Sequence, residues 1–373
     1  MNIGITGQSG FIGSHLYNYL KTMDGMTLIP FQKDYFEKED ALDRFIERCD
    51  VVVHLAGMNR GQDQEVSEIN IGLAEKLVSS LDRTHHRPHV IFSSTTQETR
   101  GTPYGESKKK SREAISKWAH ESRARFTGLI IPNIYGPFCR PFYNSVVATF
   151  CFQLTHGQEP KIIMNQPIGL LYVGELVQRI FEVIRKEQVA DELLIPAAKE
   201  IIVSELLSKL TGFKETYLEE GVIPDLADPF DLSLFNTFRS YIDTSHYPIP
   251  YDLKTDDRGS LFEVVRSLNK GQAFFSSTKP GVERGNQYHR RKVERFSIIK
   301  GRALVQLRRI GAEEIVKYTL DGDNPSYVDL PILHTHNLIN TGDEELHMLF
   351  WASELYDPDD PDTYHEKVEV EER

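Results

Sequence analysis

Residues 6–13 are Thr-Gly-Gln-Ser-Gly-Phe-Ile-Gly, and this short stretch decides the fold of the first part of the chain. It follows an apolar run at residues 2–6 and leads into residues 10–19, where apolar side chains recur at helical spacing. Between a strand and a helix, such a turn lets the backbone approach a diphosphate, and the helix N-terminus adds free N–H groups. The alternative is a glycine-rich connection with no ligand. We expect a bound dinucleotide, held by Gly7, Gly10, Phe11, Ile12 and Gly13.

The first part of the chain alternates between strand-like and helix-like segments. Further apolar runs occur at residues 27–31, 50–55, 90–93 and 128–131, and segments with helical spacing separate them. Strands that alternate with helices form parallel sheets with both faces covered. The pattern therefore predicts an α/β fold with a doubly wound, Rossmann-like sheet.

The chain changes character after about residue 240. Pro248 and Pro250 interrupt any regular element, and the short alternating runs that follow are separated by turn signals at intervals of roughly ten residues. This pattern favours an all-β barrel or sandwich. We predict domains at residues 1–244 and 245–373, and we expect the segment from Asp357 onward to be a loosely attached extension.

The composition excludes several classes of function. The chain has 373 residues, with 43 Lys and Arg against 55 Asp and Glu, and a formal net charge of −12. Phosphate backbones and anionic lipids repel an acidic chain, so we expect neither a nucleic-acid nor a membrane partner. No apolar stretch approaches the ~20 residues of a spanning helix, and residues 2–6 begin a strand without the basic segment of a signal peptide. With only three cysteines, the chain is predicted to be cytoplasmic.

Tyr104 and Lys108 form the candidate catalytic pair. They are four residues apart, so on a helix both side chains project from one face. A nearby ammonium favours the phenolate, so we expect Lys108 to lower the pKa of Tyr104 from its ordinary value of ~10. Such a tyrosine can pass a proton to a carbonyl oxygen while a hydride reaches the carbon. A hydroxyl at a strand end, from Thr95 or Ser94, could hydrogen-bond the same oxygen.

Residues 92–95, Phe-Ser-Ser-Thr, and residues 104–108, Tyr-Gly-Glu-Ser-Lys, combine with the turn at residues 6–13 into a pattern that resembles the extended short-chain dehydrogenase/reductase (SDR) family. The resemblance implies that Tyr104 and Lys108 are catalytic and that Lys108 also contacts the cofactor. It makes Thr95 the first choice for the hydroxyl and Ser94 the second.

The same resemblance implies that the loop after the apolar run at residues 50–55 contacts the cofactor. Leu55, Ala56 and Gly57 are implied to lie near the adenine and ribose of the cofactor. Lys33, at the end of the second predicted strand, could pair with a 2′-phosphate, although the carboxylate of Asp34 follows directly. The signal is mixed, and we favour NADPH over NAD.

Residues 285–294, followed by Gly301, resemble the first conserved motif of the cupin superfamily, whose members are small β-barrels. Gln287 stands where that motif normally has its first histidine. The second cupin motif is matched by Pro331, His336 and Asn340. The resemblance agrees with the strand pattern of this region.

In a cupin barrel, His289, Glu294 and His336 would form a set of two imidazoles and one carboxylate, which suits a divalent metal, zinc foremost. His334 is two residues from His336 and on the same face of a strand, so it could add a ligand or act as a base. The alternative is a metal-free barrel in which these residues line a polar pocket.

Over nearly its full length the chain resembles the bifunctional UDP-sugar epimerase/reductases of capsular-polysaccharide biosynthesis. Besides the order of the two regions, the resemblance rests on residues 143–151, 256–260, 277–281 and 361–364. It implies that the cupin domain epimerises C3 of a UDP-2-acetamido-2,6-dideoxy-4-keto-hexose. The SDR domain would then reduce the C4 ketone with NADPH, towards UDP-N-acetyl-L-fucosamine for capsule or O-antigen.

Epimerisation at C3 needs a base and a group that holds the enolate oxygen, and His289, His334, His336 or a metal between them could do either. Two alternatives remain. In one, the cupin has lost its chemistry and serves dimerisation or gating, which Gln287 favours; in the other, the chain is an NADP-binding scaffold without turnover. We also expect a homodimer, because cupin barrels present long sheet edges that a partner often covers.

Overall fold

The N-terminal unit is built on a parallel sheet. Its strands are β1 (Asn2–Thr6), β2 (Thr27–Ile29), β3 (Val51–His54), β4 (His89–Thr95), β5 (Phe126–Ile131) and β8 (Ala190–Leu194). In this computed structural model, which describes residues 1–257 and 259–370, they lie in the order β2-β1-β3-β4-β5-β8, with all neighbours parallel. The chain leaves β1 for β2 on one side and later returns to β3 on the other. The strand order therefore reverses at β1, which is where open α/β sheets bind nucleotides.

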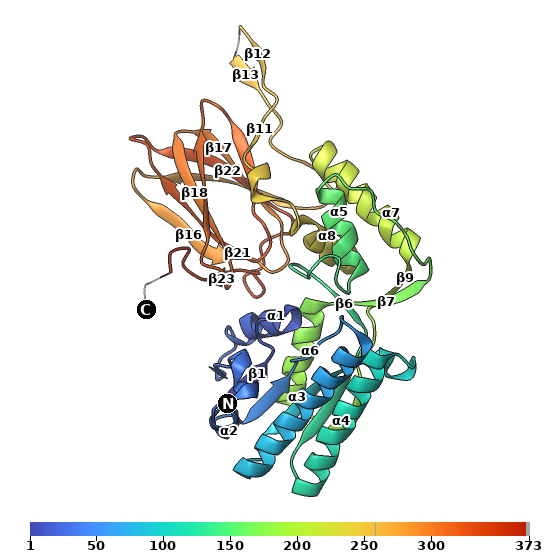
Figure 1. Cartoon of the computed structure of the whole chain (residues 1–373). Coiled ribbons are helices and arrows are strands. Elements are labelled where there is room, and N and C mark those ends of the chain that lie inside the picture. Colours follow the sequence, from blue (N-terminus) through green and yellow to red (C-terminus); the bar gives the residue numbers. More distant parts are fainter. Residues whose placement is uncertain (258, 371–373) are drawn as a thin grey trace. The chain divides into compact units, whose positions relative to one another are not determined.

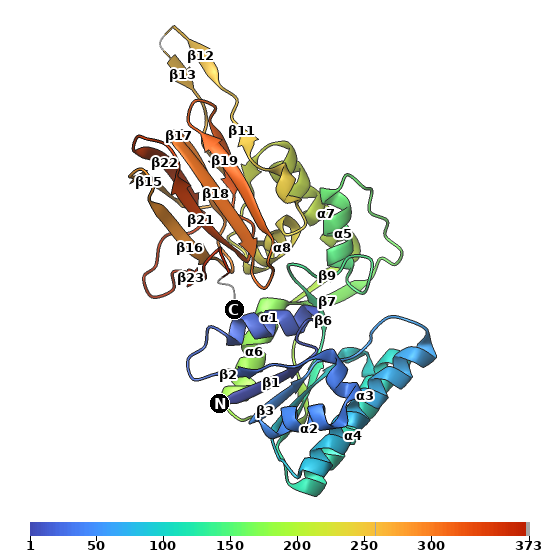
Figure 2. The same ribbon diagram turned by 60° about the vertical axis from the view of Figure 1, so that its left-hand side comes forward.

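Helices cover both faces of this sheet (Figures 1 and 2). They are α1 (Phe11–Leu20), α2 (Glu39–Glu47), α3 (Asp63–Thr84), α4 (Pro103–Ser122) and α6 (Val173–Arg185), with the short helices η1 (Lys33–Glu37) and η2 (Thr96–Thr99). Successive strand residues point to opposite faces. Val51 and Val53 therefore belong to the core beneath α1 and α6, whereas Val52 belongs to the core beneath α2, α3 and α4. The predicted doubly wound, Rossmann-like sheet is confirmed.

A small sheet completes the N-terminal unit. It consists of β6 (Asn133–Tyr135), β7 (Pro167–Tyr172) and β9 (Lys199–Ile202). Among the helices of residues 1–257 and 259–370, none has both the length and the apolar composition needed to cross a bilayer.

Two antiparallel sheets form a barrel in the C-terminal unit (Figure 2). One contains, in spatial order, β11 (Ile249–Pro250), β20 (Ser326–Asp329), β17 (Glu294–Lys300), β22 (Leu346–Ala352) and β15 (Gln272–Thr278). The other contains β19 (Ile315–Asp321), β18 (Arg302–Arg309), β21 (His334–Asn340), β16 (Glu283–Tyr288) and β23 (Tyr364–His365). Ile298 of the first sheet and Val305 of the second belong to one buried core. The predicted cupin-type barrel is confirmed.

A hairpin of β12 (Lys254–Asp256) and β13 (Gly259–Leu261) extends away from the barrel (Figures 1 and 2). It carries the 256–260 stretch on which part of the sequence resemblance rests. Arg258, which belongs to this stretch, lies outside the described residues.

The segment after Asp357 is held more firmly than the sequence suggested. Asp362 and Val368 are buried, and the carboxylate of Glu366 pairs with the guanidinium of Arg308 at 3.0 Å. The expectation of a loosely attached extension is wrong, because its acidic and proline-rich composition does not reveal these buried contacts.

The chain forms two compact units, Met1–Val146 with Met164–Val203 and Val147–Ile163 with Ser204–Arg373. Residues 204–244 are thus grouped with the barrel and not with the parallel sheet. The elements in and around this part of the chain are α7 (Val203–Phe213), η3 (Lys214–Glu219), β10 (Val222–Ile223), α8 (Pro229–Arg239) and η4 (Thr244–His246). The barrel unit also includes β14 (Arg266–Ser267) and nearly all of α5 (Val146–Thr155). That residues 1–244 and 245–373 fold as separate domains stays a prediction.

Residues 204–244 contact the barrel at and beside a buried ion pair between two of its strands. The guanidinium of Arg295 donates to both carboxylate oxygens of Asp329 at 2.7 and 2.9 Å, and both side chains are at most 3% exposed. The hydroxyl of Tyr217 also donates to Asp329, at 2.7 Å, and Arg239 donates to the carbonyl of Leu330 at 2.6 Å. The barrel therefore depends on polar contacts from the helical segment that precedes it.

Replacing Asp329 with Asn should destabilise the barrel by about 3–5 kcal/mol, because it leaves the Arg295 guanidinium buried without its counter-charge. Urea unfolding can be followed by the fluorescence of Trp351, since the chain has two tryptophans and Trp118→Phe removes the other. Lys300→Ala is the matched control: its pair with Glu344 is 60% and 71% exposed, so the loss should stay below about 1 kcal/mol. Equal losses in the two variants would contradict the role given to the buried pair.

Candidate active sites

The turn at residues 6–13 is shaped for close approach by a ligand. Gly7 has φ +74°, and a Cβ there would lie 2.8 Å from the backbone nitrogen of Ala56. A Cβ on Gly13 would collide with the carbonyl oxygen of Gly7, so only glycine lets α1 pack this close to the turn. Helix α1 begins directly after Gly10. The residues predicted to hold a diphosphate thus lie at a helix N-terminus beside the strand-order reversal.

The loop after β3 is fixed to the same place. The backbone nitrogens of Leu55 and Ala56 donate to the carbonyl and hydroxyl oxygens of Thr6, at 3.2 and 3.3 Å. A Cβ on Gly57 would lie 2.9 Å from the side-chain oxygen of Asn70, a buried residue of α3. Sequence reasoning missed Asn70, which lies inside a helical pattern and carries no motif of its own.

Lys33 is exposed at the first residue of η1, just beyond β2. The neighbouring carboxylate of Asp34 is paired with Lys38 at 2.7 Å, and this hydrogen bond raises the pKa of Lys38. Asp34, the carboxylate that weakened the sequence prediction of NADPH, is therefore paired with Lys38.

The candidate catalytic pair lies at the start of α4. Tyr104 and Lys108 are one turn apart on this helix, and the ammonium nitrogen of Lys108 lies 4.2 Å from the ring centre of Phe92 in β4. Thr95 is the last residue of β4, and its hydroxyl accepts a hydrogen bond from the backbone N–H of Gln97 at 3.2 Å. The carboxyl edge of the parallel sheet thus carries the predicted hydroxyl, and the helix that follows it carries the pair.

Burial shifts the pKa of Tyr104 in the direction opposite to the predicted one. Desolvation, with a smaller contribution from Tyr143, raises the pKa of Tyr104 to about 12. Burial also lowers the pKa of Lys108 to about 7, against the opposing effect of Glu98. The predicted lowering of the Tyr104 pKa by Lys108 is wrong for this structure, because loss of solvation, and not the ammonium of Lys108, dominates that pKa. A phenol that keeps its proton at neutral pH can serve as a proton donor.

The hydroxyl of Ser94, unlike that of Thr95, is hydrogen-bonded to a carboxylate. Its hydroxyl donates to the carboxylate of Glu98, which also accepts from the Nε and a terminal nitrogen of Arg112 at 2.9 and 2.8 Å. Glu98 belongs to η2 and Arg112 to α4, so this buried pair ties the two segments that carry Thr95 and Tyr104. Neither residue was found from the sequence, where an isolated Glu and Arg suggest surface positions.

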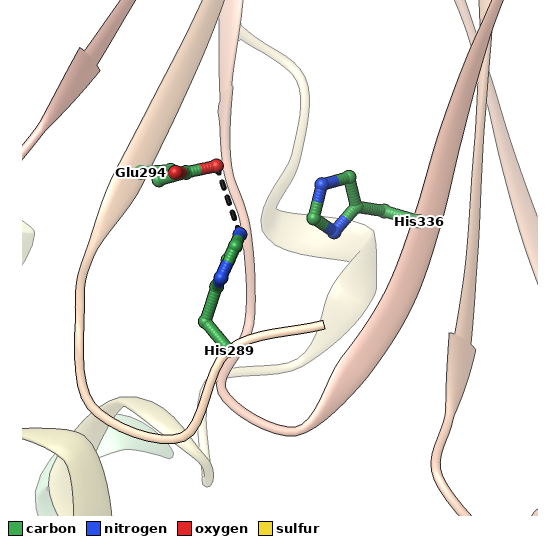
Figure 3. Close-up of side chains that lie close together, drawn as sticks. All are labelled: His289, Glu294 and His336. Atoms are coloured by element: carbon green, nitrogen blue, oxygen red, sulfur yellow. Dashed lines mark hydrogen bonds and ion pairs between the residues drawn. The ribbon is translucent and has the colours of Figure 1, made fainter. Parts of the chain in front are cut away.

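The barrel brings the three predicted metal ligands together (Figure 3). His289 follows β16, Glu294 begins β17 and His336 lies on β21. All three side chains are buried, and their ligand atoms lie within 4.8 Å of one another. The Nε2 atom of His289 lies 3.0 Å from a carboxylate oxygen of Glu294.

The charges and proton positions in this group suit a cation. Burial lowers the pKa of His336 to about 3, so its ring is neutral, and its Nε2 atom is buried with no hydrogen-bond partner among the described residues. Burial would raise the pKa of Glu294, but the hydrogen bond from His289 and the charges around it outweigh burial and hold that pKa at about 2. The group therefore offers a bare imidazole nitrogen and an ionised carboxylate, and its donor set fits zinc.

Asp362 holds the loop between two of these ligands. Its carbonyl oxygen accepts from Nδ1 of His289 at 2.7 Å, which leaves Nε2 facing the group. Its carboxylate accepts from the backbone N–H groups of Arg290, Arg291 and Lys292, at 3.0, 2.9 and 2.9 Å. Sequence reasoning missed this role because Asp362 is far from the motif that it supports.

His334 is not part of the three-residue group; its Nδ1 atom lies 2.9 Å from the carbonyl oxygen of Ile332. Beside the group lies a cavity of about 410 Å³. Its lining includes Gln287, Lys292, Glu294, Phe350, Thr363 and His365. Glu294 thus belongs to both the candidate metal centre and the cavity wall.

Comparisons with known proteins agree with both units. Residues 3–194 match the NAD dependent epimerase/dehydratase family, and residues 254–364 match the polysaccharide biosynthesis C-terminal domain. The chain is 27% identical to a Pseudomonas aeruginosa protein named UDP-2-acetamido-2,6-beta-L-arabino-hexul-4-ose reductase, over 98% of each chain.

Solved structures give the same result. The crystal structure of the capsular polysaccharide assembling protein CapF from Staphylococcus aureus is 31% identical, covers 99% of this chain and 100% of its own, and superposes with a TM-score of 0.63. A Pseudomonas aeruginosa RMD structure complexed with NADPH, 18% identical over 58% of this chain and 85% of its own, has a TM-score of 0.52 and shares the fold alone. The sequence resemblance to enzymes of capsular-polysaccharide biosynthesis is confirmed. From its first strand to the last strand of its parallel sheet, the chain belongs to the NAD dependent epimerase/dehydratase family.

Proposed function

We propose that this protein is a bifunctional nucleotide-sugar enzyme. Its N-terminal unit reduces the C4 ketone of a UDP-2-acetamido-2,6-dideoxy-4-keto-hexose with NADPH, and its barrel epimerises C3 of the same sugar, towards UDP-N-acetyl-L-fucosamine. The observation that carries the proposal is the half-buried phenol of Tyr104, which keeps its proton, one helical turn from the buried Lys108 and close to the carboxyl edge of the sheet. The full-length likeness to a protein named as a hexul-4-ose reductase supports the substrate class.

NADPH, when bound, supplies the hydride. Gly7, Gly10 and Gly13 would take its diphosphate at the N-terminus of α1, and Leu55, Ala56 and Gly57 would line its adenosine half. Lys33 would pair with the 2′-phosphate, a preference supported by the pairing of the nearby Asp34 with Lys38. The cytoplasm, as the compartment of this reaction, and a homodimer remain part of the proposal.

In the proposed reduction, Tyr104 donates its proton to the C4 oxygen as the ketone becomes a hydroxyl. Thr95 donates a hydrogen bond to the same oxygen and orients it. Lys108, when protonated, stabilises the negative charge that remains on Tyr104 after the transfer. Ser94 does not contact the sugar in this proposal; it donates a hydrogen bond to Glu98 and so positions that carboxylate.

In the proposed epimerisation, the C4 carbonyl acidifies the C3 proton, and the barrel stabilises the resulting enolate. Zinc, when bound by His289, Glu294 and His336, supplies positive charge for the enolate oxygen. The bare, buried Nε2 atom of His336 supports this assignment, because an orphaned polar atom is costly unless something binds it.

A second candidate is a reductase whose barrel has no chemistry. Gln287 favours it, because the motif normally has a histidine there. Incubation with the 4-keto sugar in deuterated water without NADPH separates the two: deuterium entering C3 supports epimerisation, and no incorporation after prolonged incubation leaves only the reductase.

Tyr104→Phe should lower NADPH oxidation with the 4-keto sugar by about 100-fold or more, because the ring keeps its shape but loses its proton. Deuterium exchange at C3 should be unchanged and is the internal control. Loss of both activities would contradict two independent sites.

The rate of reduction should fall as pH rises through about 7, because burial lowers the pKa of Lys108 to that value and only the protonated form can stabilise charge on Tyr104. Glu98 opposes this shift, so Glu98→Gln should move the alkaline limb of the kcat/KM profile to lower pH by about half a unit or more. Glu113→Gln, on the same helix in an exposed pair with Lys109, is the control and should leave the limb in place. An identical profile for all three proteins would rule out this role for Glu98.

His336→Asn should abolish stoichiometric zinc binding, measured by elemental analysis after dialysis, and slow C3 exchange by about 100-fold or more without weakening NADPH binding. His347→Asn, on β22 and outside the group, should keep both zinc and exchange. Unchanged zinc content in His336→Asn would remove the metal centre from the proposal.

A further inference from the structure

Three side chains form a row across neighbouring strands of the barrel. In the ladder between β16 and β21, Gln287 stands opposite His336; in the ladder between β16 and β23, Gln287 stands opposite His365. Residues directly opposite each other in an antiparallel pair point to the same face of the sheet. Because His336 points to the ligands His289 and Glu294 (Figure 3), Gln287 and His365 lie on the same face of the sheet as this group, and His365 is exposed on the edge strand β23.

The cavity agrees with this register. Its 410 Å³ are lined by both Gln287 and His365, together with Glu294. Adjacent strands are about 4.8 Å apart, so the backbones of His336 and His365 are separated by roughly 10 Å. The cavity that Glu294, Gln287 and His365 line is therefore the place where a sugar ring could contact both the metal-ligand group and the imidazole of His365.

We propose that His365 is the general base that removes the C3 proton of the 4-keto sugar, a role that rests on the epimerase function proposed above. A ring nitrogen of His365 takes the proton, and the C3–H bonding pair moves into the C3–C4 bond as the C4 carbonyl becomes an enolate. Protonation of C3 from the opposite face by a water molecule completes the inversion. His365 then releases its proton to solvent, so atoms and charge balance.

The carboxylates of Glu294 and Glu354 in the cavity wall are already engaged. Glu294 faces His289 at 3.0 Å and Lys292 at 3.1 Å, and Glu354 pairs with Arg291 at 3.1 Å. Within residues 1–257 and 259–370, the ring of His365 has no hydrogen bond or ion pair. Histidine is also the side chain that most often serves as a general base near neutral pH.

The register also explains how this barrel tolerates Gln287. Gln287 of β16 stands where the cupin motif has a histidine, and the residue paired with it on the neighbouring strand β23 is a histidine, His365. His365 lies outside the group whose ligand atoms fall within 4.8 Å of one another, so its ring is left for proton transfer.

The test is deuterium exchange at C3 of the 4-keto sugar without NADPH, on the full chain. His365→Gln should lower the exchange rate by about 100-fold or more, while zinc content and NADPH binding stay at the values of the unsubstituted protein. His347→Gln, on β22 and away from the cavity wall, is the matched control and should exchange normally. Imidazole added to His365→Ala should restore part of the exchange, because a diffusible base can enter the vacated space.

The outcomes separate the two proposals. Exchange by the unsubstituted protein but not by His365→Gln, with zinc retained, supports the base. Normal exchange in His365→Gln overturns this inference and leaves the epimerase intact. Loss of zinc together with exchange also overturns it, since His365 would then support the metal centre. No exchange by the unsubstituted protein overturns the epimerase and the base together.

Discussion

The reversal of strand order at β1 is the constraint on which the N-terminal site depends. Because the chain leaves β1 in one direction and returns to β3 on its other side, the turn at residues 6–13 and the loop at residues 55–57 end at the same edge of the sheet. Hydrogen bonds from that loop to Thr6 fix the arrangement. The next strand, β4, ends at this edge too and delivers Thr95, and α4 begins a few residues later.

Burial then decides the chemistry that these positions can perform. Taken out of water, Tyr104 holds its proton more tightly and Lys108 holds its proton less tightly than either would in solution. In the barrel, burial keeps His336 neutral, while nearby positive charge keeps Glu294 ionised. In both sites burial shifts the pKa values, and nearby charges oppose it: Glu98 acts on Lys108, and His289 and Lys292 act on Glu294.

The sequence predicted those features that depend on residues close together in the chain or on recurrent spacing. The glycine turn, the pair Tyr104 and Lys108, and the three barrel ligands are of this kind. The pKa direction of Tyr104 could not be predicted, because it depends on how much of the ring other segments cover. The packing of residues 204–244 could not be predicted for a related reason: a change in composition near residue 245 marks a change of secondary structure and does not say which unit the preceding segment contacts.

Asp362 links the metal-ligand loop to a part of the chain that is made much later. It is separated from His289 by 73 positions, yet its carbonyl oxygen orients that imidazole and its carboxylate gathers three backbone N–H groups. During synthesis the three ligands therefore emerge well before the residue that aligns two of them. A nascent barrel therefore has the His289 imidazole without its final orientation, so the proposed zinc site is completed only in the closing steps of folding.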